Sequence, residues 1–220
     1  MSEEKFLVID NADHTAWLKA RGYGIGGSDA SAILGMNPYK SNIELFEEKT
    51  GRRLPEDISD RSYVKYGTQA EPLIRSLFTL DYPEYQVIYH ENRILRNETF
   101  PFMQASLDGE LIDSEGRKGI LEIKTTNILQ SMQREKWKDR IPDNYYIQLL
   151  HYLMVTEFEF ADLKAQLKYD FGGEVFLQTR HYHIERNEVE EDIKYLEAAE
   201  RKFWQQVQRK EQPALILPEI

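Results

Sequence analysis

Two neighbouring segments of the chain contain the residues best suited to chemistry: SLDGEL at 106–111 and GILEIKT at 119–125. Side chains alternate between the two faces of a β-strand, so Glu122 and Lys124 would share one face of the second segment. Asp108 stands beside a glycine, and a hairpin-like pairing of the segments would bring its carboxylate next to that of Glu122. Carboxylates about 4 Å apart repel each other unless a cation lies between them. The pattern therefore predicts a divalent-cation site.

Carboxylate ligands, completed by a backbone carbonyl and water, suit Mg²⁺ or Mn²⁺ better than Zn²⁺. The chain has no cysteine, which excludes thiolate metal sites, disulfides and cysteine nucleophiles. The cation would activate water and stabilise a phosphate, and Lys124 would position or deprotonate that water or offset charge on the phosphate oxygens. A Glu-x-Lys pair is also common on solvated strands and Asp-Gly is a common turn, so the spacing alone leaves the chemistry open.

The elements expected to position these residues alternate between helical and β-rich stretches. Helices are predicted at 15–19, 28–34, 42–49, 67–80, 143–156 and 188–210, with Ser28 and Ser41 as helix caps. Strands are predicted at 86–90, 93–95, 103–112, 119–124, 160–169 and 174–184. Helices around a small antiparallel or mixed central sheet define an α/β or α+β fold.

No repeat or linker interrupts the chain, so a single domain over residues 1–220 is expected. Its parts would be a helical N-terminal region (about 1–80), a sheet core (about 86–185) and a C-terminal helix (about 188–210). The N-terminus lacks the features of a signal peptide, and no stretch approaches the roughly 20 apolar residues of a membrane span. A cytoplasmic protein without a membrane partner is therefore expected.

The net charge of −10 argues against a protein whose main task is to coat a polyanion, because phosphate affinity normally comes from excess lysine and arginine. The argument weakens if acidic residues cluster where a divalent cation neutralises them and basic residues line one channel. The sequence does not show whether they do.

The order of the motifs resembles that of phage lambda exonuclease and the YqaJ-type viral recombinase nucleases, members of the PD-(D/E)xK nuclease superfamily. The resemblance runs from about residue 17 to 156. It implies a restriction-endonuclease-like core in which Asp108, Glu122 and the backbone carbonyl of Ile123 bind the metal. The proline of the superfamily motif is replaced here by Leu107, which is not a ligand position.

Two earlier blocks also resemble the family. WLKAR at 17–21 with GGSDAS at 26–31 is similar to the segment that holds a 5′-terminal phosphate, which points to Arg21 and Ser28. Without the resemblance, this is a glycine loop that caps a helix, although a helix N-terminus also binds phosphate. The block YGTQAEP at 66–72 implies that Glu71 faces the metal; the alternative is a first-turn glutamate favoured by the helix dipole.

A later block, QLLHY at 148–152, is similar to a family helix whose glutamine and tyrosine share one face toward the active site. Gln148 would orient water or phosphate. Tyr152 is a further candidate but could belong to the core, because aromatic residues at helical spacing usually do. Ser106, close to Asp108, is another candidate site residue.

Other polar residues are interpreted as structural. The histidines in this group are His90, His151, His181 and His183. The charged residues of the C-terminal helix are interpreted as a solvated face or a subunit contact: Glu190, Glu191, Glu197, Glu200, Arg201 and Lys202.

The sequence thus predicts a Mg²⁺-dependent deoxyribonuclease. The resemblance further implies a 5′→3′ exonuclease that acts on double-stranded DNA ends, forms a trimeric ring and passes the single strand to an annealing protein. This would occur in phage-type recombination in the cytoplasm of a bacterial host, with a phage or prophage origin. The alternatives are an endonuclease or end-processing nuclease of the same fold, a non-catalytic DNA-end-binding module, and a hydrolase for other substrates that uses paired carboxylates.

Overall fold

The computed structural model describes residues 5–129 and 131–217; the first four residues of the N-terminal segment discussed above lie outside these ranges. The helices are α1 His14–Arg21, α2 Gly27–Ile33, α3 Asn42–Lys49, α4 Ser62–Asp81, α5 Ser131–Glu135, α6 Asp143–Thr156 and α7 Glu190–Arg209, with a 3₁₀ turn at Arg186–Glu188. The strands are β1 Phe6–Asp10, β2 Gln86–Ile88, β3 Arg93–Asn97, β4 Gln104–Ala105, β5 Gly109–Ile112, β6 Lys118–Ile128, β7 Phe160–Phe171 and β8 Glu174–Glu185.

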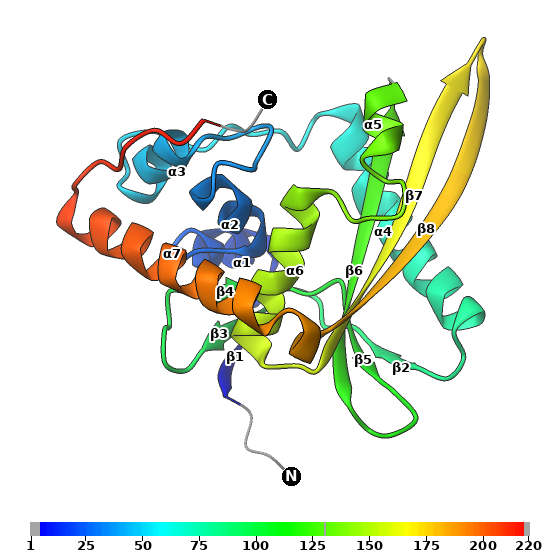
Figure 1. Cartoon of the computed structure of the whole chain (residues 1–220), viewed down its shortest axis with the longest axis horizontal. Coiled ribbons are helices and arrows are strands. Elements are labelled where there is room, and N and C mark those ends of the chain that lie inside the picture. The colour runs from blue at the N-terminus through cyan, green and yellow to red at the C-terminus, as the bar shows by residue number, and fades with distance from the viewer. Residues whose placement is uncertain (1–4, 130, 218–220) are drawn as a thin grey trace.

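A mixed five-stranded sheet in the order β2-β5-β6-β7-β8 forms the centre of the structure (Figure 1). Its central pair, β6 and β7, is parallel, with Glu122 opposite Leu163. Parallel neighbours need a crossover connection, which α5 and α6 supply. A smaller antiparallel sheet, β1-β3-β4, lies beside the first. The predicted mixed sheet flanked by helices is confirmed.

Hydrophobic packing places a helix on each face of the central sheet. On one face, Ile74 and Phe78 of α4 pack against Leu121 and Ile123 of β6. On the other, apolar residues of α6 pack with Leu163 and other residues of β6 and β7. Because side chains alternate along a strand, the even-numbered residues of β6 around Glu122 face α6.

The predicted helices at 42–49 and 143–156 have the observed bounds, and the remaining predicted elements are displaced mainly at their ends. The β-rich run predicted at 103–112 forms two strands rather than one, because the chain leaves β4 in the small sheet and enters β5 in the central one. Residues 106–108 therefore lie between two sheets, the kind of irregular segment that often carries function. The sequence analysis missed β1 and α5, both too short to show a clear period.

The predicted cap at Ser41 is confirmed: its hydroxyl accepts from the Glu44 amide at 3.2 Å. The predicted cap at Ser28 is wrong, because α2 begins one residue earlier and Gly26 occupies the cap position. A Cβ atom on Gly27 would lie 2.6 Å from a ring carbon of Tyr152. The paired glycines thus bring the start of α2 against α6, and Ser28 becomes a residue of the first helical turn.

Among the described residues, none of the helices combines the length and the apolar character needed to cross a bilayer.

Candidate metal centre

Asp108 and Glu122 meet at the pairing of β5 with β6. Gly109 lies opposite Leu121 in this antiparallel ladder, which confirms the predicted hairpin-like arrangement. Asp108, immediately before β5, accepts a hydrogen bond from the Ile123 amide at 2.8 Å through Oδ2. The Asp108 carboxylate is therefore fixed to the peptide unit that follows Glu122.

Glu122 and Lys124 share a face of β6, as the alternation predicts. The Lys124 Nζ lies 2.5 Å from Glu122 Oε1. Gln148 of α6 donates through Nε2 to the same Glu122 oxygen at 2.7 Å and to the Tyr152 hydroxyl at 2.9 Å. Glu122 is only 2% exposed, so these contacts form beneath α6. The structure thus brings the segment 119–125 and the block 148–152 together.

Glu71 approaches the same centre from the opposite helix. α4 begins at Ser62, so Glu71 lies well inside the helix and its interpretation as a first-turn residue is wrong. The Glu71 carboxylate forms an ion pair with Arg75. Arg75 also donates from Nε to the Asp108 carbonyl oxygen at 2.6 Å, and its guanidinium lies 3.6 Å from the centroid of the Tyr89 ring.

Arg75 is the main residue of this centre that the sequence analysis missed. Its one visible signal was the i,i+4 spacing from Glu71, a spacing so common on helices that it does not mark a site. The contact with the Asp108 carbonyl depends on the tertiary fold.

The electrostatics of the centre are dominated by carboxylates crowded in a buried place. Burial and repulsion from Asp108 raise the pKa of Glu122 to about 8 and that of Glu71 to about 7. Burial also raises the pKa of Asp108, although Lys124 opposes the shift. Burial disfavours the charged form of Lys124, but Glu122 and Asp108 outweigh this effect and raise its pKa. The positive charge near the carboxylates is therefore too small to keep their pKa values in the usual range. In the metal-free protein, Lys124 is held as a cation.

The donor set fits a hard divalent cation. Glu122 Oε2 is buried and has no hydrogen-bond partner among the described residues. Within residues 5–129 and 131–217, no three histidine or acidic side chains converge as a complete ligand set. Mg²⁺ commonly binds through one or two carboxylates and retains several waters, so it does not require such a set. Asp108 and Glu122 are the residues that would hold the ion.

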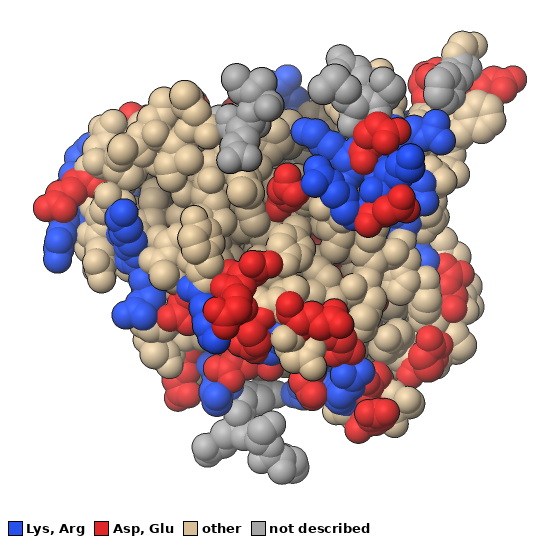
Figure 2. Space-filling model, in the orientation of Figure 1, with Lys and Arg blue, Asp and Glu red and all other residues tan. Residues whose placement is uncertain are grey.

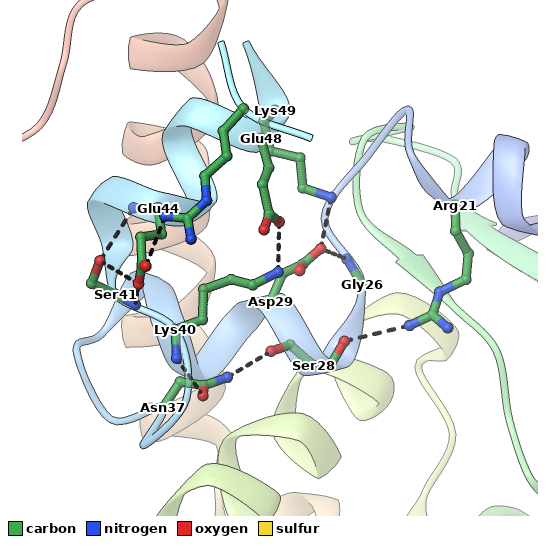
Figure 3. Close-up of polar contacts among 11 residues, drawn as sticks. Arg21, Gly26, Ser28, Asp29, Asn37, Lys40, Ser41, Glu44, Glu48 and Lys49 are labelled. Atoms are coloured by element: carbon green, nitrogen blue, oxygen red, sulfur yellow. Dashed lines mark hydrogen bonds and ion pairs between the residues drawn. The ribbon is translucent and has the colours of Figure 1, made fainter. Parts of the chain in front are cut away.

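Residues of the segments 17–21 and 26–31 lie beside this centre. Arg21, the last residue of α1, reaches toward α2, where its Nη2 lies 3.4 Å from Ser28 Oγ (Figure 3). Its guanidinium also lies 4.6 Å from the centroid of the Trp17 ring. Trp17 donates from its indole nitrogen to Ser106 Oγ at 3.1 Å. Trp17 thus connects Arg21 and Ser28 to the segment that contains Asp108.

Contacts between histidines and carboxylates form two further clusters outside this centre among the described residues. Asp162 Oδ1 is 2.6 Å from His181 Nε2 and 3.2 Å from His183 Nδ1. His151 Nδ1 lies 2.7 Å from Glu200 Oε1, and both side chains are fully buried. The interpretation of Glu200 as part of a solvated helix face is therefore wrong: its partner is a histidine on another helix, which a one-helix pattern does not reveal.

Solved structures with the same fold are exonucleases. An alkaline exonuclease (LHK-Exo) from Laribacter hongkongensis aligns with a TM-score of 0.60 and 17% identity over 88% of this chain and 94% of that one. A structure of LHK-Exo in complex with dAMP gives the same TM-score at 18% identity and the same two coverages. A phage-related exonuclease from Haemophilus somnus 129PT aligns with a TM-score of 0.53 and 17% identity over 85% of this chain and 96% of that one. The fold is thus that of an alkaline exonuclease.

The sequence places the chain within a family. Residues 16–159 match the YqaJ-like viral recombinase domain, and the chain belongs to this family. The uncharacterized protein YqaJ of Bacillus subtilis (strain 168) is 34% identical over 189 residues, which is 86% of this chain. The aligned region spans 54% of that relative's length.

Proposed function

We propose that the protein is a Mg²⁺-dependent deoxyribonuclease that hydrolyses phosphodiester bonds at the ends of double-stranded DNA. The observation that carries the proposal is the convergence of the Asp108 and Glu122 carboxylates on one buried edge of β6, beside the Lys124 ammonium. The crowding raises the pKa of Glu122, as expected of a site that gains stability from an added cation. Family membership and the exonuclease fold support the same conclusion.

Each residue has a distinct part in the proposed site. Asp108 and Glu122 hold the cation, with the Ile123 carbonyl as a further ligand and Glu71 completing the surroundings from α4. Mg²⁺, when bound, supplies positive charge to the phosphate and lowers the pKa of water. Lys124 Nζ lies beside Glu122, where it can position the attacking water or offset negative charge on the phosphate oxygens.

Gln148 is the residue through which α6 contacts the proposed metal ligands. Its amide contacts both Glu122 and Tyr152, so it fixes the orientation of the Glu122 carboxylate and can present its remaining hydrogen-bonding capacity to water or phosphate. Tyr152 is 5% exposed and acts through Gln148.

The preference for DNA ends is assigned to Arg21, Ser28 and Ser106. Arg21 provides charge and a planar set of donors suited to a terminal phosphate. Ser28 lies in the first turn of α2, where its hydroxyl faces the Arg21 guanidinium. The proposed polarity is 5′→3′, and we extend the proposal to a trimeric ring that hands the remaining strand to an annealing protein in phage-type recombination.

The proposal is tested by digesting linear duplex DNA labelled at the 5′ or the 3′ end, with and without Mg²⁺. The native chain should release the 5′ label first and stop in excess chelator. Lys124→Ala should slow hydrolysis by about 10²- to 10³-fold, whereas Lys202→Ala, an exposed change on α7, should not. Activity that persists in chelator, or is unchanged in Lys124→Ala, would refute the mechanism. Internal cuts in circular DNA would instead identify an endonuclease.

A further inference from the structure

Lysine and arginine side chains without acidic partners gather in residues 134–140 (REKWKDR), here called the basic segment. Its four basic residues are all exposed: Arg134, Lys136, Lys138 and Arg140. None of them forms an ion pair within residues 5–129 and 131–217. In contrast, many basic residues elsewhere are paired, as Arg117 is with Asp113 and Glu185.

The basic segment is fixed in place by its central residue. Trp137 is 3% exposed, and its ring packs 5.4 Å from that of Tyr145 and 6.2 Å from that of Tyr182. The Tyr182 hydroxyl also donates to the Trp137 carbonyl oxygen at 2.5 Å. With the tryptophan buried against α6 and β8, the charged residues on both sides of it extend into solvent.

Trp137 also connects the basic segment to the candidate metal centre. The Tyr145 ring packs against Trp137, and the centroid of this ring lies 5.3 Å from Lys124 Nζ in the candidate metal centre. Two packed aromatic rings therefore connect the basic segment to Lys124.

Charge is segregated on this face of the molecule. Figure 2 shows blue side chains gathered over α5 and the adjoining part of β8, with a few red ones among them, whereas red side chains dominate the lower edge. Arg180 of β8 lies two residues before Tyr182 and shares its strand face, and the Tyr182 ring packs near Trp137. Arg180 Nε is buried without a hydrogen-bond partner among the described residues.

We infer that the basic segment and Arg180 bind the phosphate backbone of duplex DNA whose end is held at the candidate metal centre. The inference rests on the proposed function. A local excess of unpaired cations in a chain of net charge −10 is complementary to a polyanion, and the contacts would be with phosphates rather than bases. The same segregation removes the objection that an acidic protein is unsuited to DNA.

The test compares two triple variants with equal charge change. Lys136→Ala, Lys138→Ala and Arg140→Ala together remove three of the four cations of the basic segment, and Lys194→Ala, Lys202→Ala and Arg209→Ala together remove three exposed cations of α7. Binding of a labelled blunt duplex is measured by fluorescence anisotropy in excess chelator, between about 50 and 200 mM salt. The basic-segment variant should bind at least about tenfold more weakly at low salt, and the slope of log affinity against log salt should become shallower by about 2–3.

The α7 variant should bind like the native chain, and both variants should keep the native thermal unfolding midpoint. Equal affinity and slope for the two variants would overturn the inference. So would weaker binding by the basic-segment variant with an unchanged salt slope, because lost phosphate contacts must alter it. Failure of the proposed function gives a different result, since the native chain would then bind DNA without cleaving it or would not bind it at all. A change in molecular mass confined to the basic-segment variant, with unchanged DNA affinity, would assign the surface to a protein contact instead.

Discussion

Two buried acidic clusters lie on the same sheet and differ in how their charge is balanced. Asp162 of β7 is fully buried and lies between two histidines, whose hydrogen bonds overcome the effect of burial and hold its pKa below the usual range. Glu122 of β6 is nearly as buried, but its neighbours include two further carboxylates and its pKa is raised to about 8. Burial alone therefore does not decide the charge of an acid in this protein.

The difference separates a structural cluster from a candidate binding site. Glu122 Oε2 and Asp162 Oδ2 both lack a hydrogen-bond partner among the described residues, so an unpaired oxygen does not distinguish them. The surrounding groups do, because Asp162 has two histidines as hydrogen-bond partners, whereas the centre around Glu122 has an excess of carboxylates. Such an excess is tolerated where an external cation compensates it.

The largest expected effect follows from Asp108→Asn. The amide can still accept the Ile123 hydrogen bond but is a poor cation ligand, so DNA hydrolysis should fall by on the order of 10³-fold. The free energy of unfolding without metal should stay the same or rise, because one of the crowded carboxylates is removed. Glu110→Gln on neighbouring β5 is the matched control and should keep its activity. Loss of stability together with activity in Asp108→Asn would indicate a structural residue.

Asp162→Asn should show the reverse pattern. Loss of the carboxylate weakens the contacts with His181 and His183 and should lower the free energy of unfolding by about 2 kcal/mol. Hydrolysis by the folded fraction should change less than about threefold. Urea denaturation and an activity assay at low temperature measure the two effects separately. An unaltered unfolding midpoint would show that the histidines do not stabilise the fold through Asp162.

Gly27→Ala should disturb the centre around Glu122 through packing. The added Cβ would lie 2.6 Å from the Tyr152 ring and 2.8 Å from Gln148 Cγ, so α2 and α6 must move apart. Overpacking of this kind costs about 1–3 kcal/mol, and a displaced Gln148 should lower kcat more than it changes KM. Gly51→Ala, with no atom within 4 Å of its Cβ position but a positive φ of 71°, serves as a control for backbone strain. Equal kcat in both variants would argue against the α2–α6 contact as a positioning element.

The pH dependence should give the smallest effect. The pKa of Glu122 is about 8 in the native chain and ordinarily 4.5, so the native state binds more protons between these values and loses stability as pH rises through them. Because Mg²⁺ binds the deprotonated carboxylates, the rise in Tm caused by adding Mg²⁺ should be larger at pH 9 than at pH 6. A scan of Tm against pH, with and without Mg²⁺, checks this expectation; a Mg²⁺ effect that shrinks with pH would contradict it.

The cluster around Asp162 should respond to pH but not to Mg²⁺. The hydrogen bond to Asp162 raises the pKa of His183 to about 9 from 6.5. The resulting stabilisation is fully present below the lower value and is lost as pH rises through the higher one. Asp162→Asn should remove this part of the pH dependence and leave the Mg²⁺ response intact.

The sequence predicted most of the fold because its helices and long strands have clear periods. Glu122 and Lys124 on one strand, and Gln148 and Tyr152 on one helix, were predicted to share faces because their spacing is local. Arg75 at the Asp108 carbonyl and His151 beside Glu200 depend on contacts between distant elements, and no local pattern shows them. The break between β4 and β5 was missed for a related reason: a continuous β-rich run does not reveal where the chain changes sheets.

The most direct test of the account is a titration of the metal-free protein with Mn²⁺ at a pH above 8, followed by electron paramagnetic resonance of the free ion. Native protein and Asp162→Asn should bind Mn²⁺ with the same affinity, and Asp108→Asn should bind it at least about tenfold more weakly. Equal Mn²⁺ affinity in the native chain and Asp108→Asn, or loss of binding in Asp162→Asn alone, would contradict the assignment of the metal centre.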